Sequence, residues 1–413
     1  MISRSNIKQI FPTMVGSMSI LTASYNIAII SVALAPIKSY MNLGGTEITL
    51  LASAILLGAV FGALFSGVFS DRFGRVGILT LDLLTFVVAG IASALVTNFI
   101  EILILRIIVG IGVGIDYVVV FTYVAEIEHR SVKRGKRLVT IMFFANFGIL
   151  LAYLLGGLIL LRLGPSGWRF ILATGALFSV VSLLMRLELK ESDLWKLGRL
   201  GSIRERVAKT IHQRNRGDMF RFSVPWFLYQ ISDQSLTLFL PVILIPYIGA
   251  SFSGGALGAV LVKLFTIPAS FLTIVLINRI GRNFLQVFGF LLRGILLGLL
   301  GIVLYMGLHI AAFAIVGMLG GSFFFGALGP DKTTVISPAE SYPTEIRGTG
   351  QGISEAFGRI GGIVGVLGFG VFSLVGAGFG LMFLSVTCIL GFIFSVIFIG
   401  WRVESTSAEI EEA

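Results

Sequence analysis

The sequence has little charge, few histidines and almost no cysteine. Its 413 residues include one cysteine, Cys388, which excludes a framework of intramolecular disulfides and a cysteine-rich metal site. The histidines, His129, His212 and His309, are scattered, and no glycine-rich phosphate-binding loop is present. Charged residues make up 13% of the chain, against roughly a quarter in soluble domains. We therefore expect no metal, no other cofactor, no enzymatic activity and no soluble fold.

Long apolar runs take the place of the missing charge. Hydrophobic residues make up 56% of the chain, and twelve runs reach the length of about 20 residues that crosses a bilayer. Inside lipid the backbone must satisfy its own hydrogen bonds, so each run is expected to be a helix. The sequence predicts an all-α membrane protein with twelve transmembrane helices. The runs are 11–36, 46–69, 76–97, 101–125, 138–162, 167–186, 221–246, 254–276, 284–307, 310–337, 349–374 and 379–401.

The basic residues lie almost entirely on one side of these predicted helices. The net charge is +10, yet the loops of the other side contain only Lys38, Arg162 and Arg169. Basic loops stay in the cytoplasm, so both termini are expected there, in a multi-pass protein of the plasma membrane. Orientation and the anionic headgroups of the lipid bilayer explain this charge, and nucleic acid is not expected as a partner.

Two motifs occur once in each half of the chain. The segment GVFSDRFGR at 67–75 follows the second apolar run, and LINRIGR at 276–282 follows the eighth. The other motif is a glutamate followed by an arginine after the fourth and tenth runs, and its members are Glu126 with Arg134 and Glu340 with Arg347.

Both motifs repeat at nearly the same spacing, which indicates a duplicated six-helix unit with both copies in one orientation. We predict two pseudo-symmetric six-helix bundles, 1–186 and 221–413, joined by a cytoplasmic linker at 187–220.

The motif G-x-x-x-D-R-x-G-R resembles the signature of the major facilitator superfamily, and the glutamate–arginine motif resembles that of its sugar-porter-like branch. This resemblance spans the chain and implies two bundles that rock about a central cavity. An aspartate near a helix end can pair with arginines and accept from exposed N–H groups, so such residues can form a latch between the bundles. The alternative is that these charges only orient the chain. The predicted gating residues are Gly67, Asp71, Arg72, Gly74, Arg75, Glu126, Arg134, Arg279, Arg282, Glu340 and Arg347.

Several charged side chains fall near the middle of predicted helices, where a charge costs several kcal/mol unless it is paired or hydrated. Asp116 lies about 15 Å from the cytoplasmic boundary at ~1.5 Å per residue, and Asp331 and Lys332 have a similar depth in the tenth helix. Gly329 and Pro330 are expected to break that helix and to free backbone groups toward a cavity.

The seventh predicted helix has a polar face. Trp226, Gln230, Asp233 and Gln234 follow helical spacing, so their side chains share one side of the helix. An aromatic ring and two amides suit a hydrated substrate site better than contact with lipid.

The segments GVGIDYVVVFTYVAE and GPDKTTVISPAESYPTEIRGTGQGI, with Trp226, are similar to helices four, seven and ten of the phosphate:proton symporters. By this resemblance Asp116 corresponds to a proton-carrying aspartate, and Tyr117 and Trp226 correspond to phosphate-contacting residues. The chain also departs from that family on helices one, five, seven and ten. The departures are Ala23 and Asn26 for two aspartates, Ala145 beside Asn146 for a glutamine, Gln230 and Gln234 for an aspartate and a tyrosine, and Asp331 for an asparagine.

The other charges within the apolar runs are interpreted as structural. Arg106 is expected to reach the outer rim, and Glu355 with Arg359 forms an ordinary pair four residues apart on a helix. The remaining members of this group are Asp82, Lys263 and Arg293.

These observations predict a monomeric secondary transporter, a proton-coupled symporter that imports a small polar anion such as phosphate or an organic acid. Asp116 and Asp331 are the predicted proton carriers, although each could instead belong to a structural ion pair. A carrier of sugars or of organic cations and drugs is the alternative; Ala152 and Tyr153 stand where exporters of the superfamily have Gly-Pro, which argues against export. The predicted substrate-binding residues are Asn26, Tyr117, Asn146, Trp226, Gln230, Asp233, Gln234, Asp331 and Lys332.

Overall fold

The computed structural model describes residues 4–128, 131–192, 195, 213–308, 310–343 and 345–400. The regular secondary structure of these residues is entirely helical. Eleven continuous helical stretches of the described chain are long and apolar enough to cross a membrane, and one of them, Lys133–Arg186, contains two crossings. The predicted all-α fold with twelve transmembrane helices is confirmed. Most of the predicted linker, 187–220, and the C-terminal residues 401–413 lie outside the described residues.

The first half of the chain forms one six-helix bundle. Its last two helices are joined by a single 3₁₀ turn that begins at Gly164, where a φ of 64° favours glycine. The helices are α1 (Arg4–Met41), α2 (Gly45–Phe73), α3 (Arg75–Ala92), α4 (Phe99–Ile127), α5 (Ser131–Leu163), the turn η1 (Gly164–Gly167) and α6 (Trp168–Arg186).

The second half repeats this arrangement with two interrupted membrane crossings. One is broken at Phe265, and the other is broken at Gly329 and Pro330, as the sequence predicts. Its helices are α9 (Gln213–Leu244), α10 (Phe252–Leu264), α11 (Thr266–Leu276), α12 (Arg282–Tyr305), α13 (Ala312–Leu328), α14 (Pro330–Ser341), α15 (Arg347–Phe372) and α16 (Ala377–Phe394), followed by the π-helical turn η2 (Ser395–Ile399).

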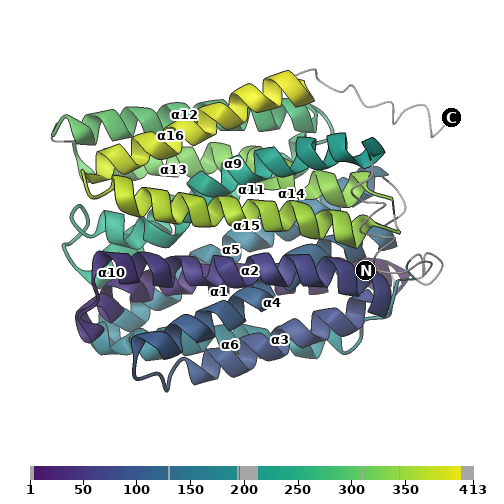
Figure 1. The fold of residues 1–413 in the computed structure, drawn as a ribbon, viewed down its shortest axis with the longest axis horizontal. Coiled ribbons are helices and arrows are strands. Elements are labelled where there is room, and N and C mark those ends of the chain that lie inside the picture. Colours follow the sequence, from purple (N-terminus) through teal and green to yellow (C-terminus); the bar gives the residue numbers. More distant parts are fainter. Residues whose placement is uncertain are drawn as a thin grey trace.

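The two bundles meet along a central interface (Figure 1). Helix α2 of the first bundle lies along α15 of the second, and α1 and α5 contact α9 and α10. Small residues bring α2 and α15 together, because a methyl group added at Gly67 would lie 2.6 Å from the carbonyl oxygen of Gly348. Helices α1 and α9 are the most completely buried of the membrane-spanning helices, so their side chains line the inside of the molecule.

Candidate functional site

A network of charged residues closes one end of the interface, where α2 ends and α15 begins. We call this the latch end. The Asp71 Oδ2 atom accepts hydrogen bonds from the backbone N–H and the hydroxyl of Thr349, at 2.9 and 2.7 Å, and so connects the two bundles. Its Oδ1 atom accepts from Arg75 at 2.7 Å, and Arg75 also pairs with Glu126 at 2.7 Å. Asp71, Arg75 and Glu126 are all buried, so these bonds are shielded from water.

The second copy of the motif has different contacts. Arg282 pairs with Glu340 inside the second bundle, and this pair lies against Gly135 of α5. The Nε atoms of Arg134 and Arg347 donate to the backbone carbonyls of nearby residues. The remaining predicted gating arginines, Arg72 and Arg279, are exposed, and Arg72 lies over the ring of Phe73.

Replacement of Asp71 by asparagine is expected to loosen the latch end. The charge and one of the acceptor oxygens are lost, which removes about 1–3 kcal/mol of hydrogen bonding and lowers the ratio of closed to open molecules by roughly 5- to 150-fold. Spin labels at the exposed positions Lys136 and Arg279, in a Cys388→Ser background, report the change as a longer distance between the bundles.

Thr349→Val is the matched variant for this measurement, because it keeps the shape and the N–H bond but removes the hydroxyl donor. We expect an intermediate distance distribution for Thr349→Val. An unchanged distribution in both variants would mean that Asp71 only orients the chain.

The centre of the interface holds a buried guanidinium. The Arg359 side chain of α15 lies over the ring of Tyr117 of α4, with the guanidinium carbon 4.5 Å from the ring centroid. Glu355 holds Arg359 through its Oε1 atom, 2.7 Å from Nε, and accepts from Trp226 Nε1 at 2.8 Å through Oε2. The Tyr117 hydroxyl is 2.8 Å from the hydroxyl of Ser24 of α1. We call Tyr117, Trp226, Glu355 and Arg359 the central cluster.

One donor of the central cluster is unused. Arg359 is fully buried, and its Nη1 atom has no hydrogen-bond partner among the described residues. A buried donor without a partner is energetically unfavourable, so this N–H group is available to donate to a bound ligand. Arg359 was interpreted from the sequence as part of an ordinary helical pair; its spacing to Glu355 is correct, but the pair lies between the bundles.

A second contact crosses the interface beside the central cluster. The Asp331 Oδ2 atom accepts from Asn146 of α5 and from its own neighbour Lys332, each at 2.8 Å. Asn146 is 4% exposed and Asp331 7%. The structure therefore brings these three predicted residues together, and the ammonium of Lys332 is occupied by Asp331.

The other predicted substrate-binding residues divide into two groups. Gln234 donates to Gln230 at 3.0 Å and packs near Gly362 of α15 at the interface. Asp233 instead pairs with Arg293 at 3.3 Å inside the second bundle. Asn26 donates to the Thr22 carbonyl and faces Gly175 of α6. Asp233 and Asn26 are thus directed into their own bundles.

Asp116 is buried within the first bundle, where it pairs with Arg186. Arg186 ends the last helix of the first bundle, and its side chain extends back into the bundle and also pairs with Asp82. Arg106, expected at the outer rim, is buried and donates to Ser93 at 2.8 Å. No metal site of three or more histidine, cysteine or acidic side chains is found within the described residues.

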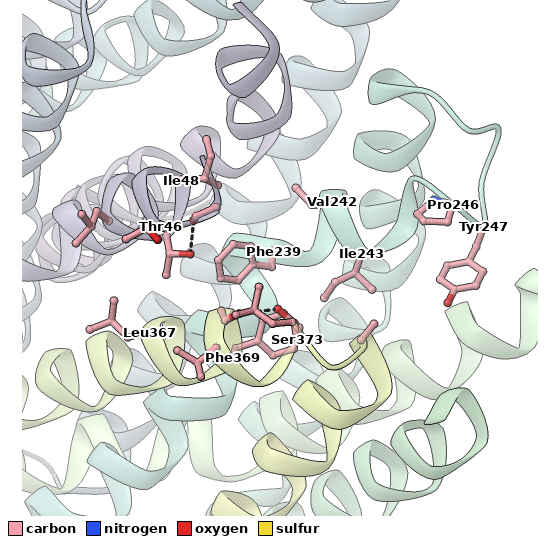
Figure 2. A pocket seen from close by; sticks show the side chains of 17 residues that line it. Thr46, Ile48, Phe239, Val242, Ile243, Pro246, Tyr247, Leu367, Phe369 and Ser373 are labelled. Atoms are coloured by element: carbon pink, nitrogen blue, oxygen red, sulfur yellow. Dashed lines mark hydrogen bonds between the residues drawn. The ribbon is translucent and has the colours of Figure 1, made fainter. Parts of the chain in front are cut away.

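A cavity of about 610 Å³ lies at the opposite end of the interface from the latch. It is enclosed by the first turns of α2 and the last turns of α9 and α15 (Figure 2). Its walls are mostly apolar, with Ile48, Phe239, Ile243 and Leu367 directed toward it. The interface therefore has a polar closed end, a charged centre and an apolar hollow end.

Comparison with known sequences gives a family match over residues 16–366, to the model described as Major Facilitator Superfamily. The NiaP protein of Bacillus subtilis, named for niacin/nicotinamide transport, is 30% identical over 88% of both chains. A rice protein named inorganic phosphate transporter 1-10 is 26% identical, covering 86% of this chain and 78% of its own. The cis,cis-muconate transport protein of Acinetobacter baylyi is 27% identical, covering 84% and 83%. These relatives are named as transporters and not as enzymes.

Solved structures agree with the fold. The proton:xylose symporter XylE, bound to 6-bromo-6-deoxy-D-glucose, has a TM-score of 0.79 at 21% identity and covers 97% of this chain and 98% of its own. An inward-open structure of XylE from E. coli has a TM-score of 0.76 at 21% identity and covers 97% and 98%. At this identity the likeness establishes the architecture of two six-helix bundles alone.

Proposed function

Because the chain belongs to the major facilitator superfamily, we propose that this membrane transporter is a proton-coupled symporter that imports a small organic anion by alternating access. The observation that carries the proposal is the buried guanidinium of Arg359 at the centre of the interface, with its free Nη1 atom. Polar groups at this position are reached from each side in turn as two bundles rock against each other.

The charge of the central cluster favours an anion that arrives with a proton. Arg359 and Glu355 together are neutral, so a bound carboxylate adds one uncompensated negative charge to a buried site. Uptake of a proton nearby removes this charge.

The walls around the guanidinium favour an anion with a flat apolar body. The rings of Trp226 and Tyr229 are stacked 5.9 Å apart, and the Tyr117 ring lies under Arg359. The cavity at the hollow end is mostly apolar, whereas inorganic phosphate requires donors on every side. Niacin and cis,cis-muconate, after which two relatives are named, are planar organic acids.

We assign the predicted residues to this function as follows. Tyr117, Trp226, Gln230 and Gln234 contact the substrate together with Arg359. Asn146, Asp331 and Lys332 join the bundles beside it, Asp116 and Asp331 exchange the proton, and the latch end faces the cytoplasm. The hollow end then faces outward, so the structure corresponds to a state closed to the cytoplasm.

Uptake into proteoliposomes tests the proposal. With an inside-alkaline pH gradient, labelled nicotinate is expected to accumulate above its external concentration, and the accumulation disappears when the gradient is collapsed. Nicotinate and nicotinamide form a matched pair, because they share one ring and differ in the anionic group. Nicotinate, benzoate and muconate should compete with the label, while nicotinamide, phosphate and xylose should not.

Competition by nicotinamide equal to that of nicotinate would remove the anion from the proposal. Competition by xylose or by quaternary amines alone would favour the sugar or cation carrier. Equal uptake with and without the gradient would exclude proton coupling.

A further inference from the structure

Three charged side chains converge inside the first bundle, where α3 packs against both α4 and α6. They are Asp82 of α3, Asp116 of α4 and Arg186 of α6, and each is at most 2% exposed. Arg186 donates to the Oδ1 atom of Asp82 through Nη1 and to that of Asp116 through Nη2. Its Nε and Nη2 atoms also donate to the Ser19 hydroxyl of α1, at 3.1 and 2.7 Å.

This group contains one acid too many. If all three side chains are ionised, two carboxylates face one guanidinium and a net negative charge remains in a site without water contact. A buried charge without a partner is strongly unfavourable, and arginine cannot lose its proton. The Oδ2 atoms of both Asp82 and Asp116 have no hydrogen-bond partner among the described residues.

A proton would complete the group. The two terminal nitrogens of one guanidinium hold the carboxyl groups of Asp82 and Asp116 beside each other, so a proton on one carboxyl group can be shared with the other. Two carboxyl groups in such contact bind the proton as a pair, and neither residue alone is its site.

The other titratable side chains around the group are engaged elsewhere. The hydroxyl of Tyr25 of α1 is 2.5 Å from that of Thr174, and Tyr117 of α4 contacts Ser24. Arg106 donates to Ser93, while Arg75 and Glu126 belong to the latch. The stretch of α2 from Ile48 to Phe69 carries no titratable side chain. Arg186 is therefore the partner available to both aspartates.

We infer that Asp82, Asp116 and Arg186 form a site for one exchangeable proton, held by the two carboxyl groups in common while the guanidinium stays charged. The proton comes from water and returns to it, and it converts a site of charge −1 into a neutral one. The role of this site in transport rests on the proposed proton coupling. Asp116 is followed by Tyr117, whose ring lies under Arg359, so the protonated site adjoins the substrate position.

If the two carboxyl groups share one proton, Asp82→Asn and Asp116→Asn should have the same effect on proton binding. Each variant leaves one carboxylate paired with one guanidinium. This pair has no net charge, so it does not bind a proton. If Asp82 only positioned Arg186, then Asp82→Asn would keep the proton on Asp116, and the two variants would differ.

Infrared spectroscopy of the purified full-length protein tests this difference. The wild type should show a protonated-carboxyl component that grows reversibly as the pH is lowered, and the spectra of both asparagine variants, subtracted from that of the wild type, should show the loss of this same component. Asp233→Asn is the matched control, because it removes an acid from a one-to-one buried pair with Arg293 and should leave the band unchanged. Asp82→Glu retains both carboxyl groups and should keep the band at a shifted frequency.

Persistence of the full band in Asp82→Asn would overturn the shared site, as would its loss in Asp233→Asn. If an asparagine variant does not fold, the shift of the band in Asp82→Glu decides, and an unshifted band overturns the inference. Uptake is measured separately. If both variants lose the band but uptake by the wild type does not depend on the pH gradient, the shared proton site is supported and the proposed proton coupling is overturned.

Discussion

Replacement of Arg359 by glutamine is expected to reduce kcat/KM for carboxylate uptake by about 10²–10³-fold. A charge-assisted hydrogen bond to a buried anion contributes roughly 3–4 kcal/mol when its partner would otherwise stay unpaired, and each 1.4 kcal/mol corresponds to a factor of ten. Arg359→Lys should retain part of the activity, because it keeps the charge but cannot hold Glu355 and the substrate with a planar fork. Initial rates of nicotinate uptake in proteoliposomes measure the effect.

Arg359→Gln also leaves Glu355 without its cation, so a loss of folding must be separated from a loss of binding. The double variant Arg359→Gln with Glu355→Gln is neutral and keeps an acceptor for Trp226 Nε1. We expect it to fold like the wild type and to remain inactive. Wild-type uptake by this double variant would show that the anion binds elsewhere.

Replacement of Arg186 by glutamine is expected to cause the largest loss of stability. It leaves Asp82 and Asp116 buried beside each other without a cation, and breaking a buried ion pair in this way costs about 3–5 kcal/mol. In a chain of this size the melting temperature should fall by about 3–6 °C. Thermal unfolding of the detergent-solubilised protein measures this decrease.

Arg106→Gln is the control for this prediction, because Arg106 is equally buried but forms no ion pair within the described residues and donates to the hydroxyl of Ser93. Its removal leaves no carboxylate unpaired and should change the melting temperature far less. When Asp82→Asn and Asp116→Asn are added to Arg186→Gln, no unpaired acid remains, so this triple variant should regain most of the lost stability. A similar decrease for Arg106→Gln and Arg186→Gln would mean that lost packing, and not the unpaired acids, destabilises the protein.

The fold was predictable because its signals are local and repeated. Apolar runs, the side on which basic residues lie and the duplicated motifs each require only neighbouring residues, and they predict the twelve helices and the break at Gly329. The pairing of Asp71 with Arg75 could also be expected, since only the short connection at Gly74 separates the end of α2 from the start of α3.

The site was less predictable, because helical spacing identifies a face but not the helix that this face contacts. Asp71 and Thr349 are 278 residues apart, and no local pattern predicts their contact. Arg186 lies at the end of an apolar run. At such a position the sequence does not distinguish an arginine side chain directed into the bundle from one directed into the cytoplasm. Asn26 was placed by resemblance to a family position, and the structure directs it toward Gly175 instead.

The small residues along α2 and α15 have a consequence for the rate of transport. Where Ala63 and Gly67 contact Gly348 and Gly352, the surfaces lack long side chains that interlock, so one helix can slide over the other without rotamer changes. At this end the bonds that must break are those from Thr349 to Asp71, while the bond from Asn146 to Asp331 joins the bundles nearer the centre. Opening of this end therefore requires the loss of hydrogen bonds and not the repacking of large side chains.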